Sequence, residues 1–115
     1  IEIKLKIMAF LMRFFSGRMS RSEWLLKNVG VIVFIIFLIF VGMRIVNNTW
    51  GTVLLFLSIA LTQLYLLSLH ARRLHDIGLS GYYAVLWFII SPLLFVFLLL
   101  KRGQEGDNQY GVVTR

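Results

Sequence analysis

Three long stretches of the chain contain no Asp, Glu, Lys or Arg, namely residues 28–43, 45–71 and 77–100. Each approaches or exceeds the roughly 20 residues that an α-helix needs to cross about 30 Å of hydrocarbon. Since lipid offers no partners to backbone polar groups, stretches of this kind are expected to be helical. The pattern predicts one domain, an all-α membrane protein with three transmembrane helices.

Local signals set the boundaries of the predicted helices. Ser20 stands three residues before Glu23, which is the capping-box spacing, and marks the start of the first helix. Gly78 is a natural end for the second, which is expected to extend about two turns into the cytoplasm, and Ser80 can cap the third. Pro92 removes a backbone donor inside the third helix and predicts a kink, or alternatively a re-entrant turn. The expected units are an interfacial segment 1–19, transmembrane helices 21–46, 52–76 and 81–101, and a polar tail 102–115.

The segment before the first transmembrane helix is predicted to lie in the membrane interface. Residues 8–15 are apolar and aromatic with one Arg, a composition typical of a short interfacial amphipathic helix. Met8 is a plausible natural start, so residues 1–7 are given no functional weight. Trp24, one turn into the first transmembrane helix, is expected at the headgroup boundary.

The distribution of charge predicts an orientation and a class of partner. The chain carries 12 Lys and Arg against 5 Asp and Glu, a net charge of +7. Eight of the basic residues fall in the N-terminal segment and the loop after the second helix, which predicts a cytoplasmic N-terminus and a periplasmic C-terminus. A re-entrant turn at Pro92 would return the tail to the cytoplasm. Because the basic residues adjoin apolar stretches, they favour anionic membrane lipids over nucleic acid.

Two sets of polar residues are candidates for a site on the cytoplasmic side. Guanidinium groups suit anionic headgroups, so a lipid or a protein partner is expected to bind the first set, Arg18, Arg21, Arg72 and Arg73. Asp76 near a helix C-terminus opposes the helix dipole and should seek a cation, Arg72 at i−4 or Arg18 or Arg21 across the interface. The second set is therefore expected to form a structural ion-pair network: Glu23, Lys27, Arg72, His75 and Asp76.

The same residues give little basis for catalysis or metal binding. His75 and Asp76 are adjacent on a helix and point apart, so they cannot form the oriented pair that general-base catalysis needs. His70 and His75 are five residues apart, whereas helical metal ligands usually stand at i and i+4. The chain has no Cys, which excludes disulfides and thiolate sites. No catalytic residue, metal or cofactor is predicted.

Polar residues also mark one stripe of the second helix, namely Ser58, Thr62, Gln63 and Tyr65. Small and hydroxylated residues let helices approach and hydrogen-bond within the membrane, so the stripe is expected to serve helix–helix packing. A homo-oligomer could instead assemble a lumen from this stripe, which leaves a channel as an alternative.

Three motifs occur in an order that resembles a known family. They are Phe-Ser-Gly-Arg with Ser-Arg-Ser-Glu-Trp over residues 15–24, Arg-Arg-Leu-His-Asp-Ile-Gly over 72–78, and a glycine-containing tail from Lys101. Together they resemble the domain-of-unknown-function 805 family of small bacterial inner-membrane proteins. The resemblance implies an inner-membrane location and lends no activity.

The predicted function is that of a non-enzymatic accessory or scaffold protein, which binds a membrane partner or anionic lipid through its basic cytoplasmic face. The alternative is a small homo-oligomeric channel or transporter.

Overall fold

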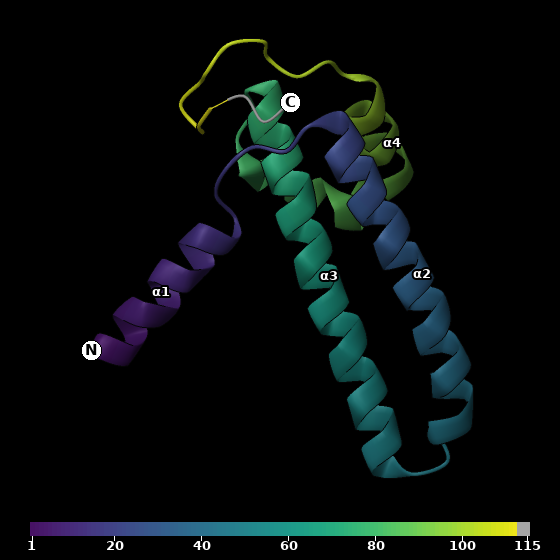
Figure 1. Cartoon of the computed structure of the whole chain (residues 1–115). Helices are drawn as coiled ribbons and strands as arrows, with labels where there is room; N and C mark the ends of the chain where they lie inside the picture. The colour runs from purple at the N-terminus through teal and green to yellow at the C-terminus, as the bar shows by residue number, and fades with distance from the viewer. Residues whose placement is uncertain (113–115) are drawn as a thin grey trace.

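The computed structural model describes residues 1–112, and these form helices joined by short turns. Three segments are long and apolar enough to cross a membrane: Arg21–Ile45, Thr49–Ile77 and Gly81–Leu100. The predicted all-α class with three such segments is thereby confirmed. Two of them, α2 (Arg21–Ile45) and α3 (Thr49–Ile77), form a long antiparallel pair, while the first helix, α1 (Glu2–Phe14), stands away from it (Figure 1).

The ends of α2 and α3 follow the local capping chemistry of the sequence. Ser20 Oγ accepts a hydrogen bond from the backbone N–H of Glu23, as the capping-box spacing predicts. Asn48 Oδ1 accepts from Gly51 N at 2.7 Å, so α3 begins at Thr49, three residues before the predicted start. Gly78 ends α3 with φ +94°, the left-handed conformation that favours glycine.

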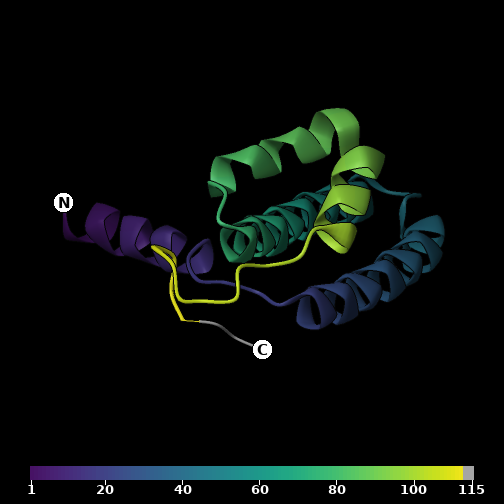
Figure 2. The ribbon, with the colours of Figure 1, turned by 90° about the horizontal axis from the view of Figure 1, so that it is seen from above.

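The third hydrophobic segment folds back toward the end of the molecule from which it starts. It consists of a 3₁₀ turn, η1 (Gly81–Leu86), followed by α4 (Trp87–Leu100), with a break in the helix at Ile90. The break lies two residues before Pro92, where the ring crowds the preceding turn, and it gives the expected kink. In Figures 1 and 2, α4 packs beside the part of α3 that is remote from the α2–α3 turn.

Close contacts place both ends of this segment next to the last turns of α3. A Cβ at Gly81 would lie 3.1 Å from Ala71 Cβ, and Arg73 Nε donates to Leu98 O at 3.0 Å. Trp87 of the same segment contacts α3 much closer to the α2–α3 turn. Its Nε1 donates to Gln63 Oε1, 14 residues before α3 ends at Ile77. At 1.5 Å per residue the segment therefore reaches about 21 Å along α3, roughly half of its length.

This geometry corrects the expected position of the tail. The backbone N–H of Gln104 donates to Asp76 O at 2.8 Å, so the tail lies at the same end of the molecule as residues 15–20. The sequence prediction placed the N-terminal segment and the tail on opposite sides of the membrane, whereas the structure brings them together at one end of the molecule. The re-entrant alternative at Pro92 describes the observed path, because the kink lets α4 bring its last carbonyls back to α3.

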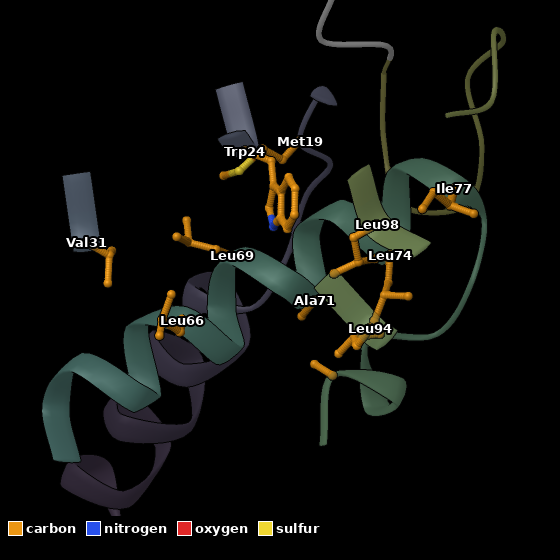
Figure 3. Close-up of a cluster of buried hydrophobic side chains, with 11 residues drawn as sticks. Met19, Trp24, Val31, Leu66, Leu69, Ala71, Leu74, Ile77, Leu94 and Leu98 are labelled. Atoms are coloured by element: carbon orange, nitrogen blue, oxygen red, sulfur yellow. The ribbon is translucent and has the colours of Figure 1, made fainter. Parts of the chain in front are cut away.

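The core of the molecule lies at this end. Its side chains come from the linker before α2, the first half of α2, the second half of α3, η1 and α4 (Figure 3). Trp24 is fully buried in it and does not lie on the outside of the bundle, and its indole N–H donates to His70 Nδ1 at 3.2 Å. The buried apolar residues are Met19, Trp24, Val31, Leu66, Leu69, Ala71, Leu74, Ile77, Ala84, Leu94 and Leu98.

Candidate functional site

A buried carboxylate between two arginines is the centre of the polar end of the molecule. Asp76 Oδ1 lies 2.9 Å from Arg18 Nη2, and Asp76 Oδ2 lies 2.6 Å from Arg73 Nη1. All three side chains are at most 1% exposed. Arg73 and Asp76 stand at i and i+3 on α3 and so share a face, while Arg18 arrives from the α1–α2 linker. The trio carries a net charge of +1 away from water.

The remaining arginine donors bind backbone carbonyls that have no helical partner. Arg18 donates to the tail, with Nη2 at 2.7 Å from Gln104 O and Nη1 at 2.8 Å from Gly106 O. Arg73 Nη2 lies 2.6 Å from Lys101 O. Carbonyls at a helix end and in an irregular tail need such donors when water is excluded. The trio therefore holds linker, α3, α4 and tail together.

The neighbouring Arg72 and His75 face the other side of α3. Arg72 Nη2 donates to Phe14 O at 2.7 Å, and its guanidinium lies 6.0 Å from the centre of the Phe14 ring. His75 Nδ1 lies 2.8 Å from Gly17 O, and its ring stacks on Tyr110 at 4.0 Å with an interplanar angle of 5°. Together the two side chains thus hold the end of α1, the linker and the tail against α3.

The structure divides the predicted ion-pair network into separate parts. Asp76 pairs with Arg73 and Arg18, whereas Arg72, its expected partner at i−4, turns toward α1. Glu23 and Lys27 do pair, at 3.0 Å, on the water-accessible side of α2 and apart from the trio. Arg73 at i−3 and Arg72 at i−4 are both within reach of Asp76 on the helix. Arg18 approaches from the linker on the side of α3 that carries Arg73, so Asp76 pairs with Arg73 there.

The predicted basic face is likewise divided. Arg18 and Arg73 are buried and bonded within the chain, Arg72 is half-buried, and Arg21 is exposed. Beside Arg21 lies a basic residue of the tail, Arg102, although the sequence predicts that the tail lies on the opposite side. The return of α4 brings Arg102 and Arg21 together, so no pattern in the local sequence could predict that they are neighbours.

These two arginines flank a cavity of about 660 Å³, which we call the basic pocket. Arg73 forms its inner wall, and in the described part of the chain no acidic side chain lines it. Leu25 supplies an apolar wall one turn farther along α2. The pocket thus combines positive charge with an apolar edge at the level where α2 begins. Its lining residues are Ser20, Arg21, Ser22, Leu25, Arg73, Arg102 and Gly103.

The polar stripe of α3 is bonded within the chain. Ser58 Oγ donates to Leu54 O and Thr62 Oγ1 to Ser58 O, both at 2.8 Å along the same helix. Gln63 accepts the Trp87 indole N–H, and Tyr65 is 38% exposed on the outside of the pair. Thr62 is buried and Ser58 and Gln63 are half-buried, and Ser58, Thr62 and Tyr65 line a small cavity with Val31 and Phe34 of α2. Within residues 1–112, no three His, Cys, Asp or Glu side chains come together as metal ligands.

Comparison with known proteins gives a family and two relatives. The chain matches the family model described as "Protein of unknown function (DUF805)" over residues 12–112. It is 34% identical over 103 residues to the inner membrane protein YhaI of Escherichia coli strain K12, which covers 84% of this chain and 82% of the relative. The same values hold for YhaI of Escherichia coli O157:H7. No solved structure shows a significant match.

Proposed function

Because the chain belongs to the DUF805 family of proteins of unknown function and is a multi-pass inner-membrane protein, we propose that it is a non-enzymatic accessory protein that binds anionic phospholipid headgroups through the basic pocket. The observation that carries the proposal is the pair of exposed guanidiniums, Arg21 and Arg102, on a pocket without acidic lining.

The chemistry of the pocket fits a lipid phosphate. Guanidinium groups form charge-assisted, often bidentate hydrogen bonds with phosphate oxygens. Within residues 1–112 Arg21 has only a long bond, at 3.5 Å, to Leu100 O, and Arg102 pairs with Glu105 where both side chains are more than 70% exposed. An exposed pair of this kind contributes little stability and can yield to a phosphate. Leu25 offers the acyl chains an apolar continuation along α2.

We propose that this end of the molecule faces the cytoplasm. Seven Lys and Arg lie at or beside it, whereas Arg44 stands near the α2–α3 turn. A cytoplasmic excess of basic residues is the usual arrangement in multi-pass proteins, and the negative cytoplasmic leaflet attracts them. The seven are Arg18, Arg21, Lys27, Arg72, Arg73, Lys101 and Arg102.

The orientation can be tested by labelling, because the chain has no cysteine of its own. Asn47→Cys marks the α2–α3 turn and Gln109→Cys the tail, and both positions are exposed. In spheroplasts a membrane-impermeant maleimide should label Asn47→Cys, and it should label Gln109→Cys only after lysis. The reverse pattern would invert the orientation, and labelling of both variants in intact spheroplasts would contradict the shared position of linker and tail.

Lipid binding can be tested by native mass spectrometry of protein released from membranes that contain phosphatidylglycerol and cardiolipin. The double substitution Arg21→Ala with Arg102→Ala should lower the retained anionic lipid about tenfold or more, at ~1 kcal/mol per basic residue near the membrane surface. Arg44→Ala, an exposed arginine at the other end, is the matched control and should retain lipid as the unmodified chain does. Equal retention by all three proteins would overturn the proposal. A co-purifying protein lost from the double variant alone would replace lipid by a protein partner.

A further inference from the structure

A second cavity of about 660 Å³ lies on the opposite side of α3 from the basic pocket and shares no lining residue with it. We call it the imidazole pocket. Its walls come from the end of α1, from α3 and from η1, and Tyr110 of the tail closes one side. Its volume is in the range of about 300–1,000 Å³ that is usual for small-molecule sites.

The lining of the imidazole pocket selects against charged ligands. Among residues 1–112 neither Lys, Arg, Asp nor Glu lines it, and most of its walls are Leu, Met, Phe, Ala and Val side chains. The side chains that bring polar atoms are His75, Ser80, Tyr82 and Tyr110. An apolar cavity with a few polar groups is typical of sites that orient an apolar ligand by one hydrogen-bonding end.

His75 presents a fixed hydrogen-bond acceptor in this pocket. Gly17 O can only accept, so the proton of the neutral imidazole sits on Nδ1, and Nε2 is left with a lone pair. Nε2 has no hydrogen-bond partner within residues 1–112. The ring cannot turn freely, because Nδ1 is held at 2.8 Å from Gly17 O and the ring face is stacked on Tyr110.

Gly81 keeps the space in front of this acceptor open. A Cβ at position 81 would lie 2.9 Å from His75 Nε2 and 3.1 Å from Ala71 Cβ. Gly81 and Ala71 line the pocket together with His75. Next to Gly81, Ser80 Oγ accepts from Tyr82 N, which leaves the Ser80 hydroxyl proton free to donate within residues 1–112. On this side of the pocket His75 Nε2 offers an acceptor and Ser80 Oγ a donor, and a hydroxyl group can pair with both kinds of group.

From this geometry we infer that the imidazole pocket binds an uncharged membrane lipid with a free hydroxyl, whose O–H donates to His75 Nε2 while its apolar body fills the space between α1, α3 and η1. The inference is independent of the basic pocket. Two kinds of lipid carry this chemistry, a diacylglycerol and a long-chain prenol.

The test uses the full chain in liposomes and diazirine-bearing lipid probes. A diacylglycerol probe and a prenol probe are each compared with the same probe acetylated at its hydroxyl, which keeps the apolar body and removes the donor. At least one hydroxyl probe should cross-link roughly fivefold more than its acetylated form, the effect of about one hydrogen bond. The probe that does so identifies the lipid class. Equal cross-linking of both forms for both probes would overturn the inference, because any acyl chain would then fill the cavity.

Two variants and one control connect the signal to the pocket. Gly81→Ala places a methyl group 2.9 Å from Nε2, in the space that the hydroxyl would occupy, and His75→Phe keeps an aromatic ring for Tyr110 but removes the acceptor. Each should reduce the cross-linking of the hydroxyl probe to that of the acetylated form. Gly30→Ala adds a methyl group on α2 with no atom within 4 Å and should leave cross-linking unchanged. Unchanged labelling of Gly81→Ala would contradict the placement of the hydroxyl.

Discussion

The two ends of the α2–α3 pair are held together by different means. At the polar end, nine of the twelve residues 66–77 are buried, and a carboxylate between two arginines joins α3 to the linker, α4 and the tail. At the turn end, only two of the fifteen residues 42–56 are buried, and both are glycines. Large side chains and charges fill the first end, and close backbone approach closes the second.

The difference teaches where single changes should be most costly. Buried charges at the polar end depend on one another, so removal of one partner leaves the others desolvated and unpaired. The turn end contains little that can be lost, and it is sensitive chiefly to added volume. Substitutions that remove a group at the first end and add one at the second can therefore test the comparison.

The largest effect is expected for Asp76→Ala. This change leaves Arg18 and Arg73, both buried, without their carboxylate, and should lower the free energy of unfolding by ~3–5 kcal/mol. Thermal unfolding in detergent, followed by tryptophan fluorescence, measures it, since Trp24 is fully buried in the core nearby. Glu23→Ala, which removes a carboxylate from an exposed pair, is the control. A loss no greater than that of the control would mean that the trio contributes little to the polar end.

A smaller loss is expected for Gly51→Ala at the turn end. A Cβ at position 51 would lie 1.8 Å from Ile45 O, a backbone atom that can move only if α2 and α3 separate. Overpacking of this kind costs about 1–3 kcal/mol, measured by the same unfolding assay. Gly30→Ala is again the control, because it meets open space and should be neutral or slightly stabilising in a helix. Equal melting of the two variants would show that the turn adapts without loss.

The contrast also explains what could be predicted from the sequence. The three apolar stretches, the Ser20 cap and the Gly78 end follow from local composition and local hydrogen bonding, and the structure has all of them. The return of the third segment does not follow, because residues 81–100 have the same composition whether they cross the membrane or fold back. They are held by hydrogen bonds from Arg73 to Leu98 O and Lys101 O, which lie 25 and 28 residues farther along the chain.

The same limit applies to the candidate site. The sequence indicates correctly that Asp76 needs a cation and that Arg18 is one candidate, but both Arg72 and Arg73 are within helical reach of it. The choice of Arg73 depends on the linker, which brings Arg18 to one side of α3 and Phe14 O to the other. The basic pocket was missed for a related reason, since Arg102 reaches Arg21 only through the path of α4.

A third, weaker effect is expected for Gly42→Ala. The added Cβ would lie 2.9 Å from Leu55 Cδ2, the far end of a flexible side chain, so a change of rotamer can relieve the contact. The loss should stay below ~1 kcal/mol, less than for Gly51→Ala. A double-mutant cycle with Leu55→Ala sharpens the test, since the smaller side chain should remove the penalty of the methyl group. Purely additive losses would mean that the two residues do not limit the helix approach.

The smallest effect is expected for Lys27→Gln, which breaks the i,i+4 pair with Glu23 at the polar end. Both side chains are about 40% exposed, at 38% and 43%, so water and salt already screen the 3.0 Å contact. The expected loss is ~0.3–0.5 kcal/mol, and it should fade at high ionic strength, whereas the loss in Asp76→Ala should persist because its partners are shielded from ions. Unfolding curves of both variants at low and high salt make the comparison. A loss in Asp76→Ala that changes with salt would mean that water and ions reach the trio. Burial would then not explain the difference between the two ion pairs.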